Sequence, residues 1–347
     1  MHSKATHTSK RKKDHISICL KDDLNFITKT TGFENYEFEH FAATEVNINK
    51  IDLSSLFFRR EIRYPFLISC MTGGTIEADS INAKLAEAAQ NLNIPIGVGS
   101  QRQAIESNKN HNSYKIIRKI AKDVPVLSNI GAAQIAGMNS MDDIHLIIDL
   151  IEADALVIHL NPLQELLQPE GETYFKGLLK NIKKIKKRIS VPVIVKEVGS
   201  GIGKKTAKIL LNNGVDGIDV AGSGGTSWAG VELIRKGNRE EKYFWDWGLP
   251  TSYCIKKLNK LKKKNNFLLI GSGGINDFDS AAKALVLGAD IVASARILLI
   301  EAEKGVKPIV DLIENWFENI KKIMFLTGAS NLTEFKKTRL IKKKDLY

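Results

Sequence analysis

The chain has 347 residues, 43% hydrophobic and 26% charged, and could form two average globular domains or one large α/β barrel. No run approaches the ~18 consecutive apolar residues of a membrane span, and no apolar segment follows the basic N-terminus as in a signal peptide. The net charge of +12 leaves nucleic acid, an anionic membrane or a polyanionic small molecule open as a partner.

Cys19, Cys70 and Cys254 lie far apart without CxxC spacing, and their odd number favours reduced thiols in a cytosolic protein. We therefore expect a cytoplasmic protein with no membrane partner. Lysine runs at 180–188, 256–264 and 336–344 are typical of solvated helix faces. They lack the interleaved aromatics of single-strand binders, so we expect no nucleic-acid partner. A basic nucleic-acid-binding module remains the alternative from another class, which a salt-dependent DNA-binding assay would detect.

The first 60 residues are predicted to form a basic arm and then an irregular or β-hairpin lid. Short apolar, β-branched runs then recur, separated by stretches of helical periodicity such as 82–92, 205–214 and 279–290. Gly214 and Gly288 suit the left-handed position after a helix. The eight runs predict strands at 65–71, 94–99, 124–130, 155–160, 191–198, 217–222, 267–273 and 290–295.

Apolar strands that alternate with helices indicate a parallel sheet covered on its outer side, and eight such units favour a closed (β/α)8 TIM barrel over residues 61–330. A basic C-terminal tail, 331–347, would follow. A doubly wound sheet is the alternative, but 71–78 lacks the GxGxxG turn it would need. The long loop at 222–250, which carries three tryptophans, is expected to fold over the barrel mouth.

Polar residues gather where the predicted strands end, which is where barrel enzymes place their active sites. Lys196 lies inside a buried strand, where a lysine is costly unless it meets a partner charge or a polar ligand. Alternatively, the Lys196 side chain could extend to the end of the barrel or form an ion pair with Glu197. Gly273 and Gly274 after strand seven and Arg296 after strand eight favour a phosphate-bearing cofactor over simple tight turns.

The richest polar group follows strand four, in HLNPLQE. One carboxylate, Glu165, beside Asn161 and Gln164 suits Mg²⁺ completed by water and substrate phosphate oxygens better than a transition metal. Alternatively, His159 could be a structural histidine that is hydrogen-bonded at the end of the barrel. Glu165 could likewise be an ordinary loop carboxylate in contact with solvent. The segment 11–16, RKKDHI, has the composition of a flexible basic arm; its alternative is a diphosphate clamp.

Together these motifs resemble the type 2, FMN-dependent isopentenyl-diphosphate isomerase family. The resemblance covers about 11–300 and rests, in order, on RKKDH, MTGG, GSQR, SNIGA, HLNPLQE, VKEVGSG, DVAGSGGTSW and GSGGI. It implies an enzyme of isoprenoid biosynthesis that interconverts isopentenyl and dimethylallyl diphosphate by a 1,3-proton shift. It also implies FMN in its reduced form, Mg²⁺, NADPH as reductant, and a homo-oligomer, a tetramer or higher. Family members often carry Ser where this chain has Ala221, so a flavin contact would be missing or supplied by Ser223.

The resemblance also assigns roles to residues. Gln164 and His159 would be catalytic, and Glu165 would hold the metal. Substrate would be held by Arg11, Lys12, His15, Ser100, Arg102, Asn161 and Gln164. FMN would be held by Met71, Thr72, Gly73, Ser100, Asn129, Lys196, Thr226, Gly273, Gly274, Ala295 and Arg296.

The nearest enzyme alternative is an FMN barrel oxidoreductase of the 2-hydroxy-acid oxidase type. That chemistry needs a base beside the flavin, typically a His in an HGG motif, whereas the matching segment here reads SGGTSW. A dehydrogenase with a cysteine nucleophile would need that Cys in a strand-end loop. Cys70 is predicted to lie inside strand one, which disfavours this reading.

Overall fold

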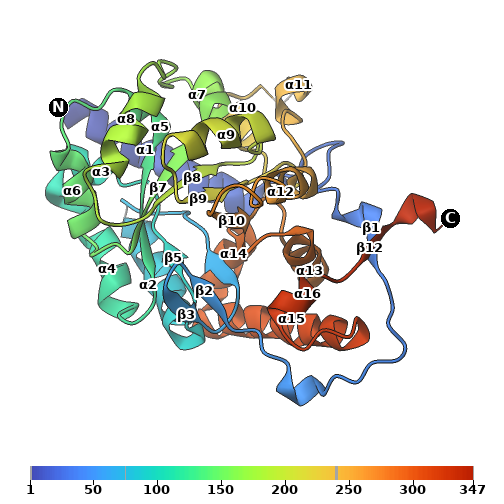
Figure 1. Ribbon diagram of the computed structural model, residues 1–347. Helices are drawn as coiled ribbons and strands as arrows, with labels where there is room; N and C mark the ends of the chain where they lie inside the picture. The colour runs from blue at the N-terminus through green and yellow to red at the C-terminus, as the bar shows by residue number, and fades with distance from the viewer. Residues whose placement is uncertain (1, 75, 239–240, 347) are drawn as a thin grey trace.

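The computed structural model describes residues 2–74, 76–238 and 241–346. Its centre is a closed barrel of eight parallel strands in sequential order, in which the last strand pairs with the first (Figure 1). The predicted TIM barrel is confirmed, and each predicted run overlaps one strand. The strands are β4 (Phe66–Ile68), β5 (Ile96–Gly97), β6 (Val126–Gly131), β7 (Ala155–Leu160), β8 (Val193–Glu197), β9 (Gly217–Asp219), β10 (Leu268–Gly271) and β11 (Ile291–Ser294).

The side chains that point into the barrel form two zones, one apolar and one polar. Leu127, Val157 and Ile194 belong to an apolar cluster that fills the end where the strands begin. Side chains two positions further along a strand return to the same face. These are Asn129, His159 and Lys196, so the interior becomes polar at the end where the strands finish.

Helices form the outer layer, as the periodicity predicts. Gly214 (φ +87°) and Gly288 (φ +118°) have the left-handed conformation expected after a helix. The main outer helices are α2 (Ile76–Leu92), α4 (Asn112–Ile120), α6 (Asp142–Asp149), α8 (Leu178–Lys186), α9 (Lys204–Asn212), α12 (Thr251–Asn259), α13 (Phe278–Leu287), α14 (Arg296–Lys304) and α15 (Val306–Leu326). Shorter ones are α3 (Arg102–Glu106), α5 (Ala132–Ala136), α7 (Pro162–Leu167) and α16 (Leu332–Phe335).

The long segment after β9 contains α10 (Trp228–Arg235) and α11 (Lys242–Trp245). Its residues 239 and 240 lie outside the described residues. Trp245 is buried against α10, where only a glycine fits: a Cβ on Gly230 would lie 2.6 Å from the indole. Trp228 lines the mouth of the barrel, while Trp247 is half-exposed.

The N-terminal segment is not the flexible arm that its composition predicts. It forms α1 (His2–Lys21), which lies across the mouth of the barrel (Figure 1). The segment contains neither Gly nor Pro, so nothing breaks the helix. Tertiary contacts hold its end: Arg296 donates to the carbonyls of Cys19 (2.8 Å) and Asp22 (2.6 Å). A cation at a helix C-terminus also interacts favourably with the helix dipole.

The predicted hairpin exists but lies at the opposite end of the barrel. It consists of β2 (Ser55–Phe57) and β3 (Arg60–Ile62). Phe57 and Ile62 join the apolar cluster inside the barrel, and Arg60 pairs with Asp154 (3.2 Å), just before β7. The hairpin therefore plugs the end where the strands begin.

Segments near both ends of the chain form a second small sheet. β1 (Tyr36–Phe38) pairs antiparallel with β12 (Leu340–Lys342), so the predicted basic tail contains a paired strand. The 3-10 helices are Phe33–Asn35, Ile48–Lys50, Asn108–Asn110 and Lys343–Asp345.

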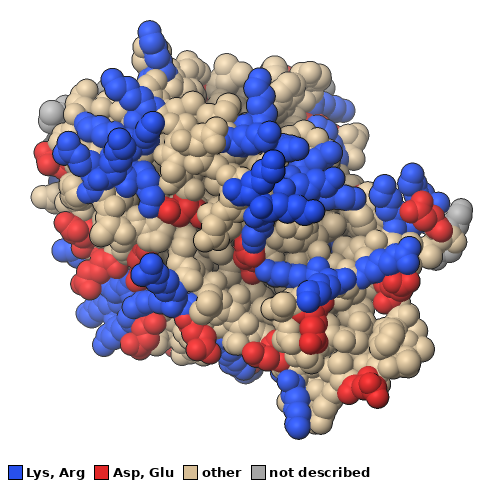
Figure 2. Space-filling model, viewed as in Figure 1, with Lys and Arg blue, Asp and Glu red and all other residues tan. Residues whose placement is uncertain are grey.

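Charge is unevenly distributed over the surface. In Figure 2, Lys and Arg dominate the upper half of the molecule, whereas most Asp and Glu lie in the lower half. None of the described helices is both long and apolar enough to cross a membrane.

Candidate active site

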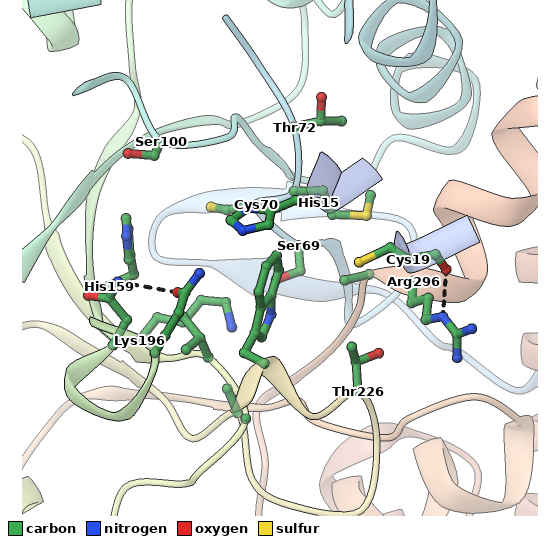
Figure 3. A pocket seen from close by; sticks show the side chains of 18 of the residues that line it. His15, Cys19, Ser69, Cys70, Thr72, Ser100, His159, Lys196, Thr226 and Arg296 are labelled. Atoms are coloured by element: carbon green, nitrogen blue, oxygen red, sulfur yellow. Dashed lines mark hydrogen bonds between the residues drawn. The ribbon is translucent and has the colours of Figure 1, made fainter. Parts of the chain in front are cut away.

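A cavity of about 250 Å³ opens at the end of the barrel where the strands finish. All of the residues that the sequence predicts as site residues line it. They come from the C-terminal ends of all eight barrel strands, or from the segments that follow them, and from α1. Figure 3 shows His159 and Lys196 on one side of this cavity and Cys19 and Arg296 on the other.

His159 is a neutral imidazole with a defined tautomer. Burial lowers its pKa to about 3, and the charges of Lys196, Lys12 and Arg11 act in the same direction. Asn129 donates through Nδ2 to the Val98 carbonyl (3.2 Å), so its Oδ1 is the atom that meets His159 Nδ1 at 2.9 Å. Nδ1 must therefore carry the proton, which leaves Nε2 as a hydrogen-bond acceptor.

Lys196 is held at the cavity wall by the strand ends. Its ammonium donates to the carbonyl of Glu197 (2.7 Å) and lies 3.7 Å from the Asp219 carboxylate. The Glu197 carboxylate itself accepts from the backbone N–H groups of residues 198–201. Lys196 thus meets the carbonyl and not the carboxylate of Glu197. Asp219, an acid in a buried strand, was missed, although the reasoning applied to Lys196 would have found it.

The HLNPLQE segment forms the end of β7 and helix α7, with Pro162 at the first helical position, where its missing N–H costs no bond. Glu165 is buried; it accepts from Asn161 Nδ2 (2.9 Å) and from the Glu172 N–H (2.7 Å). It is therefore not the solvated loop carboxylate of the alternative reading. Among the described residues, no group of three or more His, Cys, Asp or Glu side chains could hold a metal. A cation at Glu165 would need most of its ligands from water and substrate.

Gln164 is fixed at both ends of its amide. Its Nε2 donates to Glu232 (3.1 Å), and its Oε1 accepts from Asn161 Nδ2 (3.3 Å). Glu232 is fully buried and also accepts from Arg235 (2.8 Å) and faces His15 Nε2 (2.9 Å). These contacts, led by the bond to His15, hold the pKa of Glu232 below its usual range against the effect of burial. Sequence reasoning missed Glu232, whose signal is an acid inside the apolar segment WAGVELI.

The α1 cations do not play equivalent parts. Lys12 donates to the carbonyls of Gly73 (2.5 Å) and Ser100 (2.9 Å) and to the Tyr114 hydroxyl (3.1 Å). These acceptors match the three donors of an ammonium, so Lys12 anchors α1 to the loops after β4 and β5. Burial lowers its pKa to about 7, and Arg11 contributes in the same direction. Tyr114, a fully buried residue of α4, was also missed.

Two arginines line the cavity and also bind other residues of the protein. Arg102 pairs with Glu106 (2.8 Å) and Glu172 (2.7 Å). Arg296 holds the end of α1, as described above. Arg11 also lines the cavity, and burial lowers its pKa, followed by the charge of Arg102. Three guanidinium groups around one cavity favour an anionic ligand.

The loops after β9 and β10 need their glycines for close packing. A Cβ on Gly273 (φ +96°) would lie 2.2 Å from the Gly222 carbonyl oxygen. A Cβ on Gly274 (φ +71°) would lie 2.7 Å from the Gly224 carbonyl oxygen. Packing alone therefore accounts for both glycines, which is the tight-turn alternative. Both also line the cavity beside the first turn of α14, where backbone N–H groups have no partner within the helix.

Two buried polar atoms of the cavity wall lack a hydrogen-bond partner in the described part of the chain: Thr72 Oγ1 and Asn161 Oδ1. Buried polar atoms normally have partners, so these two atoms favour a polar ligand. Together with the α14 terminus and the cations, they fit a phosphate-bearing cofactor such as FMN.

Ala221 lines the cavity, whereas Ser223 is fully buried and does not, so a flavin contact from Ser223 stays a prediction. The expectation for Cys70 needs correction. Cys70 does not lie inside a strand; it follows β4 and lines the cavity. Burial raises the pKa of its thiol to about 12, so it is not an activated nucleophile.

Residues 169–342 match the family model described as FMN-dependent dehydrogenase. The chain is 42% identical to the isopentenyl-diphosphate delta-isomerase of Pelodictyon phaeoclathratiforme, over 97% of this chain and 98% of the relative. It is 44% identical to the protein of the same name from Nostoc sp., over 96% of each chain.

Similar solved structures include a protein described as a lactate oxidase from Pediococcus acidilactici (TM-score 0.71, 14% identity, 98% of this chain and 94% of that chain). A mandelate oxidase is also similar (TM-score 0.66, 14% identity, 97% and 98%). At this identity the likeness concerns the barrel fold alone. The identity to curated relatives over nearly the whole length goes further: the chain belongs to the isopentenyl-diphosphate delta-isomerase family.

Proposed function

We propose that the protein interconverts isopentenyl diphosphate and dimethylallyl diphosphate with the help of FMN and Mg²⁺. The proposal rests on the set of residues that line one cavity. It combines a helix N-terminus, three arginines and the hydrogen-bonded group Asn161–Gln164–Glu165. The family membership supports the substrate, and the match to FMN-dependent proteins supports the cofactor.

FMN would be held by the residues that the sequence predicts for it. The loops after β10 and β11, with the first turn of α14, would take its phosphate. Thr72, Asn129, Lys196 and Thr226 would meet the rest of it from the cavity wall. When bound in its reduced form, FMN would supply an electron-rich surface and an exchangeable proton for an unactivated alkene. We propose NADPH as the reductant.

The substrate diphosphate would lie between α1 and the loop after β5. Arg11, His15, Ser100 and Arg102 line that side of the cavity. Lys12 would act mainly through docking of α1, because its three donors are already used. Glu165 would bind Mg²⁺ with its remaining lone pairs, and diphosphate and water oxygens would complete the coordination.

At the reacting end, this chain's residues orient groups more than they transfer protons. The Gln164 amide is held between Asn161 and Glu232, so it fixes the alkene and is not an independent base. The neutral His159 presents Nε2 as an acceptor and cannot serve as a general acid near neutral pH. These two properties favour proton delivery by the cofactor. A tetramer or a higher homo-oligomer remains part of the proposal.

The test is an anaerobic assay of the purified protein with isopentenyl diphosphate, FMN, Mg²⁺ and NADPH. We expect many dimethylallyl diphosphate molecules per NADPH oxidised, since the isomerisation has no net redox change. One NADPH consumed per product would assign the protein to the oxidoreductases. Full activity with oxidised FMN under air, without a reductant, would remove the reduced cofactor from the proposal.

An oxidase of 2-hydroxy acids is the second candidate, favoured by the likeness of the fold to such enzymes. That reaction needs a base beside the flavin. His159, with a pKa of about 3, is too weak a base for efficient catalysis at neutral pH. The other histidine of the cavity, His15, has its Nε2 held against Glu232 (2.9 Å). Hydrogen peroxide formation from lactate or mandelate in the presence of FMN would support this candidate against the isomerase.

A further inference from the structure

A group of lysines on the outer wall of the barrel has no part in the cavity. The helices α8, α9 and α12 contain Lys but no Asp or Glu. They follow β7, β8 and β9, and each of these strands pairs with the next one in the series β7, β8, β9, β10. Helix α9 packs against α12. We call the exposed basic side chains of 180–188, 204–208 and 256–264 the lysine face. Figure 2 shows Lys and Arg gathered over these helices.

The charge of the lysine face is largely uncompensated. The half-buried Lys186 and Lys262 pair with Asp216 and Asp290. The exposed Lys183, Lys184 and Lys208 have no ion-pair partner within the described ranges. Lysines of α15 differ, because most of them pair within the helix, as Lys307 does with Asp311. The lysine face is therefore a region of positive potential and not merely a solvated helix surface.

Each of the three helices also exposes one large apolar side chain among its lysines. Leu179 of α8 is 39% exposed, Ile209 of α9 is 38% exposed and Tyr253 of α12 is 46% exposed. The Lys257 ammonium lies 5.2 Å from the centre of the Tyr253 ring. Single exposed apolar residues are ordinary, but their repetition within a lysine-rich surface is typical of contact with anionic lipid.

The alternative polyanion is nucleic acid, and two observations disfavour it. The lysine face lies on the convex wall of a barrel and not in a groove that could follow a phosphate backbone. Its cations are lysines apart from Arg188, and Arg is the usual side chain for bidentate contacts with phosphates and bases. Lysines instead suit a layer of anionic lipid headgroups, and exposed Leu, Ile and Tyr suit the apolar boundary beneath that layer.

We propose that the lysine face docks the protein onto the surface of an anionic lipid bilayer. Lysine ammonium groups contact lipid phosphates, while Leu179, Ile209 and Tyr253 enter the interfacial layer. The contact is peripheral and reversible. The face lies on the side of the barrel and the cavity opens at its end, so docking leaves the mouth accessible. This proposal does not depend on the proposed activity.

The test is flotation of the full-length protein with vesicles of phosphatidylcholine alone or with about one-third phosphatidylglycerol, at low and physiological salt. A variant with Lys183→Glu, Lys184→Glu and Lys208→Glu changes the face without touching the cavity. The matched control is Lys115→Glu, Lys119→Glu and Lys122→Glu at α4, which has the same change in net charge. Thermal unfolding verifies that both variants fold.

We expect binding to the anionic vesicles that weakens with salt, with little binding to phosphatidylcholine. The lysine-face variant should lose about tenfold or more in apparent affinity, and the control less than about threefold. Tyr253→Ser should weaken binding while the net charge stays constant. Equal losses in both triple variants would attribute binding to net charge and overturn the proposal. So would tighter binding of duplex or single-stranded DNA than of vesicles at the same salt.

Discussion

The amide of Gln164 has a fixed orientation because a buried carboxylate selects which end faces it. Glu232 can only accept, so it holds Gln164 Nε2, and the opposite end of the amide receives a hydrogen bond from Asn161. His159 and Asn129 form a comparable pair, in which the Asn amide determines which ring nitrogen carries the proton. At Gln164 and His159 the candidate site thus presents neutral groups whose orientation is fixed by hydrogen bonds.

Gln164→Ala should lower kcat by about 10²-fold, because the alkene would lose its positioning group. FMN should bind with nearly unchanged affinity. Steady-state kinetics and flavin titration measure both quantities. Leu166→Ala, at an exposed position of the same helix, serves as the control. A loss of FMN binding that matches the loss of kcat would show that Gln164 holds the cofactor instead.

His159 makes stability depend on pH in a definite direction. Its pKa is about 3 in the fold and near 6.5 when unfolded, so below pH 6.5 the unfolded chain takes up a proton that the native protein does not. The free energy of unfolding should therefore fall as the pH decreases from about 6.5, on the order of 1 kcal/mol per pH unit from this residue. Urea unfolding of FMN-free His159→Gln should lack this contribution. Parallel pH curves for variant and wild type would contradict a buried neutral imidazole.

At the scale of elements, α1 is the part that completes the cavity. It is held at its middle by Lys12, on one side by the pair His15–Glu232 and at its end by Arg296. Composition predicts a flexible arm here because basic, polar residues have few apolar partners along the chain. The helix is stabilised by contacts with elements more than 60 positions away in the sequence. A local sequence pattern cannot reveal such contacts.

Lys12→Met should release α1 from the loops after β4 and β5. We expect KM for the diphosphate to rise about tenfold or more with a smaller change in kcat, because substrate-binding groups would no longer be held in place. Limited proteolysis within residues 2–21 should become faster. Lys21→Met, at an exposed position of the same helix, should change neither quantity. Unchanged KM and unchanged proteolysis of Lys12→Met would mean that α1 does not need this anchor.

At the scale of the whole molecule, the barrel brings the residues proposed to bind cofactor and substrate to one cavity, from strands spread over more than 200 residues. The purified protein should bind FMN in about one-to-one ratio and riboflavin much more weakly, because the loops after β10 and β11 offer a phosphate site. Fluorescence quenching of each flavin measures the two affinities. Equal affinities would assign the α14 terminus to some other anion.

Much of the fold could be predicted because barrel strands carry local signals. Each apolar run overlaps one strand, and the polar residues near the end of that strand face the cavity, as Asn129 and His159 do. Residues whose importance depends on a distant partner were not predicted. Glu232 matters because His15 reaches it from α1, and Tyr114 because it accepts from Lys12. Their own neighbours in the sequence resemble any buried helix.

Glu165→Gln tests the proposed Mg²⁺ site. A neutral amide keeps one acceptor oxygen but removes the charge that a divalent cation requires. We expect activity to need at least about tenfold more Mg²⁺, with FMN affinity unchanged. The measurement is activity against Mg²⁺ concentration at constant substrate. An identical Mg²⁺ dependence in the variant would place the cation elsewhere.

The pairing of β4 with β11 and of β1 with β12 also determines when this protein can finish folding during its synthesis. The ribosome releases β4 long before β11 exists, so the first barrel strand must wait for its final neighbour. Strand β1 waits longer still, until residues 340–342 have left the exit tunnel. Nascent chains that lack these segments expose unpaired strand edges, which can pair with other chains and aggregate.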